Sequence, residues 1–347
     1  EIVNSDWSSD VCSSDLGRTF PSGRTGQSSV FLWIQEKMSV LISGSIAYDN
    51  ILSYGSRFSD HLIPGSLDHI NLSFVTDNMI RGYGGCAANI AYSLKMLGGD
   101  PLVIGAVGTD GRDYQVYFEM HGIDTALVKL NDTFTAQCFT TTDITGAQIT
   151  AFNPGAMLRS HEAPFPEDRK IELAIVGPDG KQAMQQRSRE LAIRKIPFIF
   201  DIGQGAPLFN GEEMKEMLYL ADYAVASDYE ADLMTRATGL TVDQIASGLK
   251  AFIITHGEKG STVYYDGKTL DVPAVKSNAV DPVGAGDAYR GGLLYGLTHG
   301  YDWQQTLRLA SVMGSFKVES AGAQAYKATK EEIAAKYEKA YGEKIEL

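Results

Sequence analysis

Short apolar runs alternate along the chain with longer mixed stretches. In one of these, at residues 87–97, apolar residues recur at helical spacing, and the others are polar and helix-like. The apolar runs have the length of buried strands, and the mixed stretches have the length of helices. We predict strands at residues 40–46, 102–107, 173–176, 198–200, 223–226 and 252–255, and helices at residues 87–97, 183–194, 212–221 and 229–238. Strands that alternate with helices are typical of a layered α/β fold with a mainly parallel sheet.

Two segments, at about residues 50–82 and 133–153, interrupt this alternation. They lack helical periodicity, and they contain β-type runs at residues 70–75, 134–142 and 148–152 with a turn-like Asp-Ile-Thr-Gly at 143–146. Ligands of open α/β sheets bind beyond the carboxyl ends of the strands. We therefore predict that the two segments form a small β-sheet lid, which excludes water from a reaction at that edge.

The first 37 residues differ from the rest of the chain. Ser-Ser-Asp occurs at residues 8–10 and again at 13–15, in a stretch whose low hydrophobicity favours disorder. Residues 7–16 resemble translated adaptor or vector sequence. We expect the natural protein to begin at Met38, with residues 1–37 as a disordered, non-native extension and residues 38–347 as the domain. The alternative is a natural flexible extension.

Composition narrows the class of partner. The chain has 44% hydrophobic and 21% charged residues, and its net charge is −13. An acidic surface argues against nucleic acid and anionic membranes as partners. No apolar run reaches the roughly 18 residues of a membrane-spanning helix. The three cysteines lack paired spacing and the six histidines lack metal-ligand spacing. We expect a protein of the reducing cytoplasm that acts on small molecules.

The most informative motif is Asp-Pro-Val-Gly-Ala-Gly-Asp-Ala-Tyr-Arg-Gly-Gly at residues 281–292. Small residues at 284–286 let backbone N–H groups converge on an anion, and the start of a helix adds partial positive charge at the same point. A carboxylate beside such an anion hole is electrostatically unfavourable. It becomes useful if Asp287 takes a proton from an alcohol that attacks a phosphate held in the hole.

Two further motifs each allow a functional and a structural interpretation. Gly84-Gly85 precedes a predicted helix bearing Asn89, whose amide can bond a substrate hydroxyl, although the glycines can also be a simple tight turn. Asp49 follows the first predicted strand. Its carboxylate can accept hydrogen bonds from a vicinal diol, or it can cap a loop.

Nucleotide-binding patterns are present in weak form. Residues 82–87 fit the dinucleotide pattern G-x-G-x-x-A, but they do not follow a long apolar strand, which argues against a hydride-transfer enzyme. The glycines of residues 255–261 (Thr-His-Gly-Glu-Lys-Gly-Ser) permit a tight turn close to a nucleotide, or an ordinary hairpin into a strand at 263–265. No Walker A motif occurs in the sequence, so a P-loop NTPase is disfavoured.

Together these motifs resemble the ribokinase-like (PfkB) carbohydrate and nucleoside kinases. The resemblance extends from Met38 to about Tyr341, and the motif around Asp287 is its most specific part. Residues 44–49, 84–97, 134–137 and 281–297 are closest to bacterial adenosine kinases. The resemblance implies a ribokinase-like α/β fold that uses ATP with Mg²⁺, and K⁺ is an activator in some members. Residues 315–325 are candidates for lining such a cation site. Members are monomers or lid-mediated dimers.

The resemblance also implies roles for individual residues. Asp287 would be the general base, and the N–H groups of Gly284, Ala285 and Gly286 would form the anion hole. The remaining assignments are the acceptor-binding residues Asp49, Gly84, Gly85, Asn89, Phe134 and Gln137, the ATP-binding residues Thr255, Gly257, Gly260 and Asp281, and Glu230 as an indirect, water-mediated magnesium residue. The chain departs from the family at Ser227, where an N-x-x-E motif has Asn, and at Pro282, where Thr is usual.

We expect phosphorylation of the 5′-hydroxyl of adenosine. The predicted lid contains Phe74, Met79, Phe134, Phe139 and Phe152, on which a flat purine can stack, although these side chains can also form the lid's own core. A sugar kinase of the ribokinase or fructokinase type is the alternative. A non-catalytic nucleoside- or sugar-binding regulator is a third interpretation, which only Ser227 favours.

The role of Asp287 is testable by the isosteric substitution Asp287→Asn. The variant should keep the fold and lose about 10²–10⁴-fold in turnover, which is the usual contribution of a general base. Initial rates of ADP formation, together with circular dichroism spectra of both proteins, measure this effect. Near-normal turnover would contradict the assignment.

Overall fold

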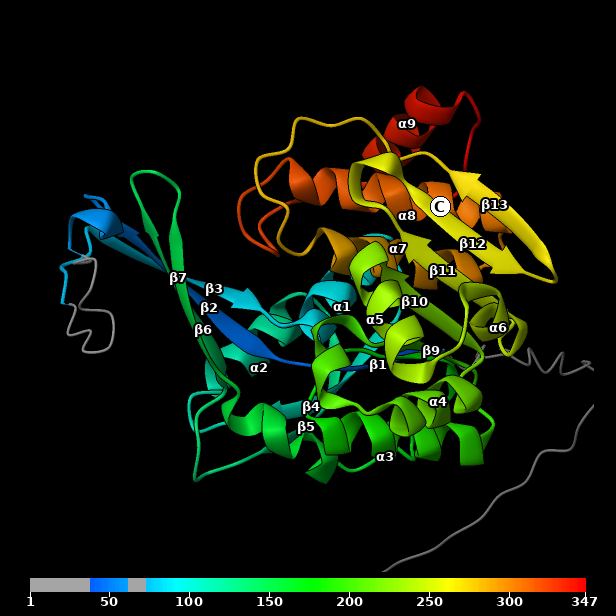
Figure 1. The fold of residues 1–347 in the computed structure, drawn as a ribbon, viewed down its shortest axis with the longest axis horizontal. Coiled ribbons are helices and arrows are strands. Elements are labelled where there is room, and N and C mark those ends of the chain that lie inside the picture. The colour runs from blue at the N-terminus through cyan, green and yellow to red at the C-terminus, as the bar shows by residue number, and fades with distance from the viewer. Residues whose placement is uncertain (1–37, 62–72) are drawn as a thin grey trace, which may run out of the picture. The chain divides into compact units, whose positions relative to one another are not determined.

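The computed structural model describes residues 38–61 and 73–347; the predicted extension at residues 1–37 lies outside this part. Within it, nine strands form the main sheet in the order β13-β12-β11-β10-β9-β8-β1-β4-β5 (Figure 1). Their bounds are β1 Ser39–Ser43, β4 Pro101–Val107, β5 Asp124–Lys129, β8 Ile171–Val176, β9 Phe198–Asp201, β10 Tyr223–Ser227, β11 Ala251–Thr255, β12 Ser261–Tyr265 and β13 Lys268–Val272. The strands from β11 to β5 pair in parallel, and β12 and β13 are antiparallel. The predicted mainly parallel α/β sheet is therefore confirmed.

Helices cover both faces of this sheet because successive strand side chains point to opposite sides. Val40 and Ile42 pack into one hydrophobic cluster, whereas Leu41 between them packs into the other. The first cluster includes residues of α1 (Cys86–Met96), α2 (Arg112–Met120), α7 (Ala285–Thr298), α8 (Trp303–Val318) and α9 (Lys330–Tyr341). The second includes residues of α3 (Lys181–Arg194), α4 (Gly211–Leu220), α5 (Asp228–Thr238) and α6 (Val242–Ser247).

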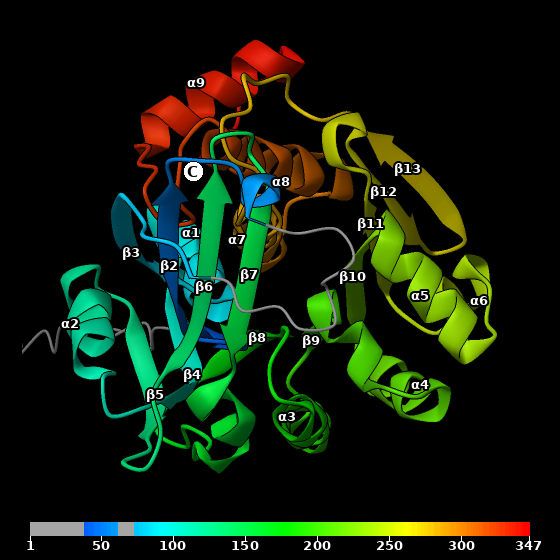
Figure 2. The ribbon, with the colours of Figure 1, turned by 60° about the vertical axis from the view of Figure 1, so that its left-hand side comes forward.

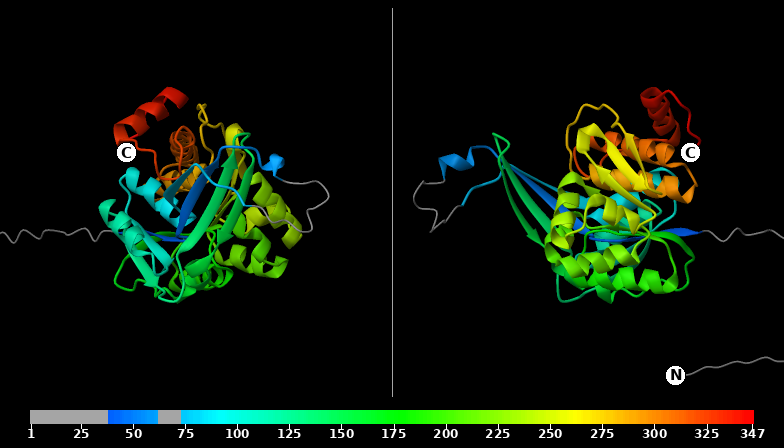
Figure 3. Two further views of the ribbon diagram at one scale, coloured as in Figure 1. Left: turned by 90° about the vertical axis from the view of Figure 1, so that its left-hand side faces the viewer. Right: turned by 45° about the vertical axis from the view of Figure 1, so that its right-hand side comes forward.

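A separate four-stranded sheet has the order β3-β2-β6-β7. Its strands are β2 (Ala47–Tyr54), β3 (Asn78–Gly84), β6 (Ala136–Asp143) and β7 (Gln148–Asn153), and they come from the two segments predicted to form the lid. Figure 2 shows these strands side by side, and Figure 3 shows them extending away from the main sheet. We call this sheet the lid sheet.

The predicted hairpin turn of the lid sheet is confirmed. Asp143 Oδ1 accepts hydrogen bonds from the backbone N–H groups of Thr145 (2.7 Å) and Ala147 (3.0 Å), and Gly146 has φ 83°. A carboxylate that bonds its own following backbone groups closes a tight turn, and glycine adopts a positive φ without steric cost. The short β6–β7 connection follows directly from these two residues.

The strand predicted at residues 70–75 is wrong where the structure describes it. Residues 73–75 are not in a strand, and residues 70–72 lie outside the described part. The Phe74 ring instead packs against Tyr54 and Phe58, with ring centroids 4.8 Å and 5.4 Å apart. The lid strand begins later, at Asn78, in a stretch too polar to be recognised as a strand by its apolar pattern.

Helix α7 packs unusually close to α8. A Cβ atom added at Gly292 would lie 2.6 Å from the Cα atom of Ala310, so only glycine permits this approach. The contact sets the direction of α7, and therefore the position of the residues at its start, which face the carboxyl ends of the parallel strands.

Gly292→Ala tests this contact. Overpacking typically costs roughly 1–3 kcal/mol, which a helix-propensity gain of about 1 kcal/mol partly offsets. We expect a lower midpoint of urea unfolding than in the control Gly248→Ala, where the added Cβ would lie at an ordinary 3.5 Å from the Ile245 carbonyl oxygen. Equal midpoints for the two variants would show that α8 adjusts freely.

Candidate active site

The predicted anion-binding loop forms the start of α7. Gly284 is the N-cap residue with φ 81°, in the left-handed region that glycine favours, and Ala285 and Gly286 begin the first turn. The first N–H groups of a helix lack intrahelical partners and carry partial positive charge. The Ala285 N–H donates to the Pro282 carbonyl oxygen (3.1 Å) and so closes the loop itself. The local geometry therefore suits an anion, and the anion-hole role stays a prediction.

Asp287 lies in the first turn of α7. The residue as a whole is half-buried, but protein atoms surround its carboxyl group. Its Oδ2 accepts a hydrogen bond from Asn89 Nδ2 at 2.8 Å. Loss of hydration raises the pKa of Asp287 to about 6, although Asn89 and Arg290 oppose this shift. A carboxyl group with such a pKa can exchange a proton near neutral pH.

Asp49 on β2 faces the same region. A Cβ atom at Gly84 would lie 2.2 Å from Asp49 Oδ2, and Gly85 begins α1 with φ 86°. Both glycines are thus required where they stand, one for space and the other for its backbone conformation. Burial, with a contribution from Asp281, raises the pKa of Asp49 to about 6. Asp49 also contributes to the raised pKa of Asp287, so the two carboxyl groups are electrostatically coupled.

Gln324 and Tyr114 complete this group, and neither was predicted as a site residue. Gln324 Nε2 donates to Asn89 Oδ1 (2.8 Å) and to Tyr114 Oη (3.3 Å), and the Tyr114 hydroxyl donates to the Gly84 carbonyl oxygen (2.6 Å). Because Gln324 occupies the amide oxygen of Asn89, the amide nitrogen points to Asp287. The only sequence signal was that Gln324 falls within residues 315–325.

Arg290 and Asp201 form a buried ion pair behind the start of α7. Arg290 Nη2 lies 2.7 Å from Asp201 Oδ1, its Nε bonds Oδ2, and its Nη1 donates to the Gly286 carbonyl oxygen at 3.1 Å. Although burial opposes the charge, the Asp201 carboxylate raises the pKa of Arg290 above its usual value. The bidentate pair holds Arg290 in place, and its bond to the Gly286 carbonyl oxygen ties it to the first turn of α7.

The lid sheet divides the predicted acceptor residues between its two faces. Strand register places Asp49 beside Cys138 of β6, and Cys138 beside Phe152 of β7, on one face. Gln137 lies on the opposite face, where its Nε2 donates to Asp110 Oδ2 (3.1 Å) and its Oε1 accepts from Asn50. Sequence reasoning missed Cys138.

Phe134 lies just before β6, and its ring is largely exposed. Its backbone packs against Gly108, where an added Cβ atom would lie 2.2 Å from the Phe134 carbonyl carbon. The residue therefore stands at the base of the lid sheet. Its predicted role in acceptor binding, like that of Gln137, stays a prediction.

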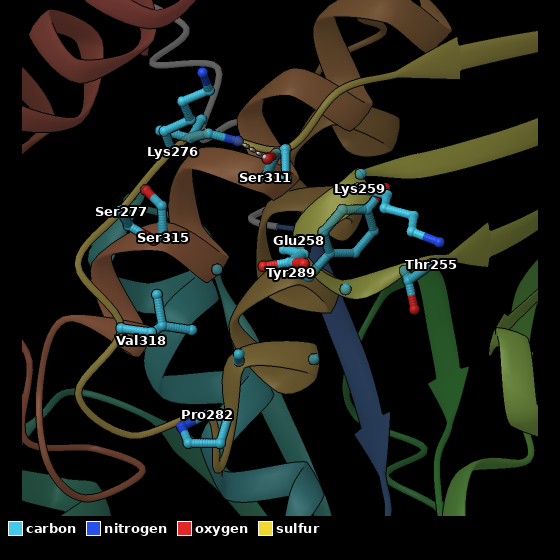
Figure 4. Close-up of a pocket in the computed structure, with 18 residues that line it drawn as sticks. Thr255, Glu258, Lys259, Lys276, Ser277, Pro282, Tyr289, Ser311, Ser315 and Val318 are labelled. Carbon is cyan, nitrogen blue, oxygen red and sulfur yellow. Dashed lines mark hydrogen bonds between the residues drawn. The ribbon is translucent and has the colours of Figure 1, made fainter.

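A cavity of about 850 Å³ lies beside the start of α7 (Figure 4). Thr255, Gly257 and Gly260 line it together with Ala285 and Gly286, and the pocket has the size of a typical small-molecule site. The structure thus brings the three predicted ATP residues next to the predicted anion hole.

Asp281 was also predicted to bind ATP, and this role stays a prediction. It does not line the cavity. Its carboxylate accepts hydrogen bonds from the backbone N–H groups of Val283 (3.0 Å) and Gly322 (2.8 Å). Asp281 therefore holds the shape of the loop from behind.

Ser227 and Glu230 form a capping box at the start of α5. The Ser227 N–H donates to Glu230 Oε2 (2.7 Å), and the Glu230 N–H donates to Ser227 Oγ (3.3 Å). Serine and asparagine cap helices about equally well, so Ser227 preserves this function of the family's Asn. No group of three or more metal-ligating side chains occurs at residues 38–61 or 73–347. A lone carboxylate such as Glu230 suits a Mg²⁺ ion that binds mainly to nucleotide phosphates and water.

Comparison with known proteins decides the family. The sequence profile of the pfkB family carbohydrate kinases matches residues 67–330. The chain belongs to the pfkB family. It is a phosphotransferase that acts on a hydroxyl group, and its fold is ribokinase-like, as predicted.

Relatives of this pfkB kinase include several nucleoside kinases. The solved structure of the Burkholderia thailandensis nucleoside kinase with inosine is 47% identical, has a TM-score of 0.79, and covers 88% of this chain and 99% of its own. The same enzyme has been solved with ADP-inosine. The nucleoside kinases of Methanothermobacter thermautotrophicus and Methanocaldococcus jannaschii are 30% and 28% identical, over 79% and 78% of this chain and 91% and 90% of their own. Within the described residues of this kinase, no helix is long and apolar enough to span a bilayer.

The two raised carboxyl pKa values predict the pH dependence of this kinase. Burial raises the pKa of both Asp287 and Asp49 to about 6, and their predicted roles, as base and as diol-binding carboxylate, both use the charged form. We expect kcat/KM to fall as pH decreases through about 6, approaching second order in protons, and to become first order in Asp49→Asn. The measurement is a pH-rate profile with circular dichroism at each pH. A folded enzyme whose profile stays flat to about pH 5 would contradict the prediction.

Proposed function

We propose that this pfkB kinase transfers the γ-phosphate of ATP to the 5′-hydroxyl of a purine nucleoside, with adenosine as the preferred acceptor. The carrying observation is that Asn89 Nδ2 bonds Asp287 Oδ2 at 2.8 Å, and that Asp49 packs against Gly84 at the start of the segment that leads into the helix of Asn89. A ribose bound here would meet the two carboxylate oxygens of Asp49, which accept hydrogen bonds, and the side-chain amide of Asn89. Asp287, the proposed base, lies beside Asn89.

In the proposed reaction the ribose diol donates hydrogen bonds to the Asp49 carboxylate, and the Asn89 side-chain amide makes a hydrogen bond to a ribose hydroxyl group. The 5′-hydroxyl then lies against Asp287, which takes its proton. A bond forms between O5′ and the γ-phosphorus as the bond to the β,γ-bridging oxygen breaks, which gives ADP and a nucleoside 5′-monophosphate. Most of the rate enhancement comes from positioning and charge stabilisation, as is usual in phosphoryl transfer.

The nucleotide would occupy the cavity lined by Thr255, Gly257 and Gly260, with its terminal phosphate at the N–H groups of the Gly284–Gly286 loop. Bound Mg²⁺ would neutralise phosphate charge, and Glu230 would contact it through water. The use of ATP is supported by the 47% identical nucleoside kinase that binds ADP-inosine.

The lid sheet favours a purine over a free sugar. The row Asp49–Cys138–Phe152 runs across the face that carries the candidate diol-binding carboxylate, and Phe152 has half of its surface exposed. The Phe152 ring, on the edge strand β7 and two strands away from Asp49, offers a stacking surface to a flat base bound at Asp49. The inosine complex of the Burkholderia relative supports a purine nucleoside and makes inosine the competitor to compare with adenosine.

A panel of acceptors tests the proposal. We expect ADP formation with adenosine and inosine to exceed that with cytidine, ribose, fructose and fructose 6-phosphate by about tenfold or more in kcat/KM, and nuclear magnetic resonance to locate the phosphate on O5′. Phe152→Ala should raise KM for adenosine with little change in kcat, because stacking is a binding contribution. The matched control is Phe139→Ala, on the opposite face of the same sheet.

The alternatives give different results in the same assay. Preference for ribose or fructose, with no nucleoside turnover, would establish a sugar kinase. Tight binding of adenosine in titration calorimetry without ADP formation would establish a non-catalytic regulator. Cytoplasmic location and a monomeric or homodimeric state stay predictions.

A further inference from the structure

Lys317 is a completely buried lysine on the last turns of α8. Its ammonium donates to the backbone carbonyl oxygens of Asp281 (2.9 Å) and Ser320 (3.0 Å), and it lies 3.5 Å from Asp281 Oδ2. Lysine is almost never fully buried unless it is paired. Two carbonyl oxygens and a carboxylate oxygen therefore surround a single fixed positive charge.

Such a set of oxygens is what a hard cation would otherwise bind. The resemblance to ribokinase-like kinases implied K⁺ as a possible activator, with residues 315–325 as its candidate lining. The residues present do not fit a bound K⁺, because the ammonium of Lys317 already takes the oxygens of Asp281 and Ser320. The chain supplies this charge from its own side chain.

The ammonium lies directly behind the predicted anion hole. A Cβ atom at Gly284 would lie 3.5 Å from Lys317 Cε, and the N–H groups of Val280 and Asp281 donate to the carbonyl oxygen of Val318. Lys317 thus joins the loop that begins α7 to the loop after α8. The second loop carries Gln324, which holds Asn89 against Asp287.

We propose that Lys317 is a positioning residue whose ammonium replaces a bound monovalent cation, fixes the loop at residues 281–286, and makes the kinase independent of added K⁺. Only the expected effect of Lys317 on turnover rests on the proposed phosphoryl transfer. The occupation of the oxygens by Lys317 can be tested without any activity.

The first experiment compares the wild type with Lys317→Ala in tetramethylammonium, K⁺ and NH₄⁺ at equal ionic strength. We expect the wild type to show the same melting temperature and kcat in all three salts. Lys317→Ala leaves a space beside unpaired oxygens, so K⁺ and NH₄⁺ should raise its melting temperature. Its kcat in tetramethylammonium should be about tenfold to a hundredfold lower, the scale of a small misplacement of reacting groups, and should recover partly with K⁺ or NH₄⁺.

Two further variants serve as controls. Lys317→Met fills the space with an apolar chain and should lose turnover without recovery in either salt. Lys336→Ala removes a lysine of α9 whose ammonium pairs with Glu319 at 3.0 Å near the surface, and it should behave like the wild type. If Lys317→Ala folds only with K⁺ or NH₄⁺ present, the inference is supported.

Several outcomes would overturn the inference. They are activation of the wild type by K⁺, wild-type turnover in Lys317→Met, or a folded Lys317→Ala whose melting temperature and turnover ignore the added cation. The proposed nucleoside kinase activity fails separately, if no acceptor in the panel is phosphorylated while the melting temperature of Lys317→Ala still responds to NH₄⁺.

Discussion

A poorly hydrated carboxylate beside an anion-binding helix start is the constraint on which the site depends. Asp287 must carry its charge where a phosphate is expected, and a carboxylate and a phosphate repel each other at close range. The fold lessens the conflict in two ways. Loss of hydration raises the pKa of Asp287 to about 6, and Asn89 bonds the ionised form. The first turn of α7 adds partial positive charge to the same place. The close packing of α7 against α8 at Gly292 sets the direction of α7 and so the position of this turn.

Two buried cations, Arg290 and Lys317, lie near the start of α7, and each is paired with a carboxylate other than Asp287. Arg290 is matched to Asp201 and Lys317 to Asp281, so each cation has its own carboxylate. Even as a paired group Arg290 lowers the pKa of Asp287, and an unpaired cation in its place would lower that pKa further. As paired groups, Arg290 and Lys317 instead bond backbone carbonyl oxygens, at Gly286 and at Asp281. They hold the two ends of the same short loop, at residues 281 and 286.

Much of the fold could be predicted because buried parallel strands and helices with one apolar side leave recognisable patterns, as at residues 102–107 and 87–97. The motif around Asp287 was predictable because its glycines serve local backbone geometry. Gln324, Asp201 and Lys317 were not recognised, since their roles depend on contacts with residues tens to hundreds of positions away. A lysine or glutamine in a polar stretch has no local signature of burial, and the strand at Asn78–Gly84 lacks one of pairing.

The lid sheet shows why acceptor identity is the hardest property to obtain from sequence. Gln137 and Cys138 are neighbours in the chain, yet register alone decides which one shares a face with Asp49. A shift of one residue would exchange them, because successive strand side chains point to opposite faces.

The family motif marks this segment without specifying the register. The register is set by tertiary contacts: Asp110, after β4, accepts hydrogen bonds from Gln137 Nε2 and the Thr135 N–H, and so ties the base of β6 to the main sheet. The predicted catalytic residues and the lid residues that share a face with Asp49 are therefore specified by different parts of the chain, and substitutions in β6 and β7 can alter that face while the start of α7 is left untouched.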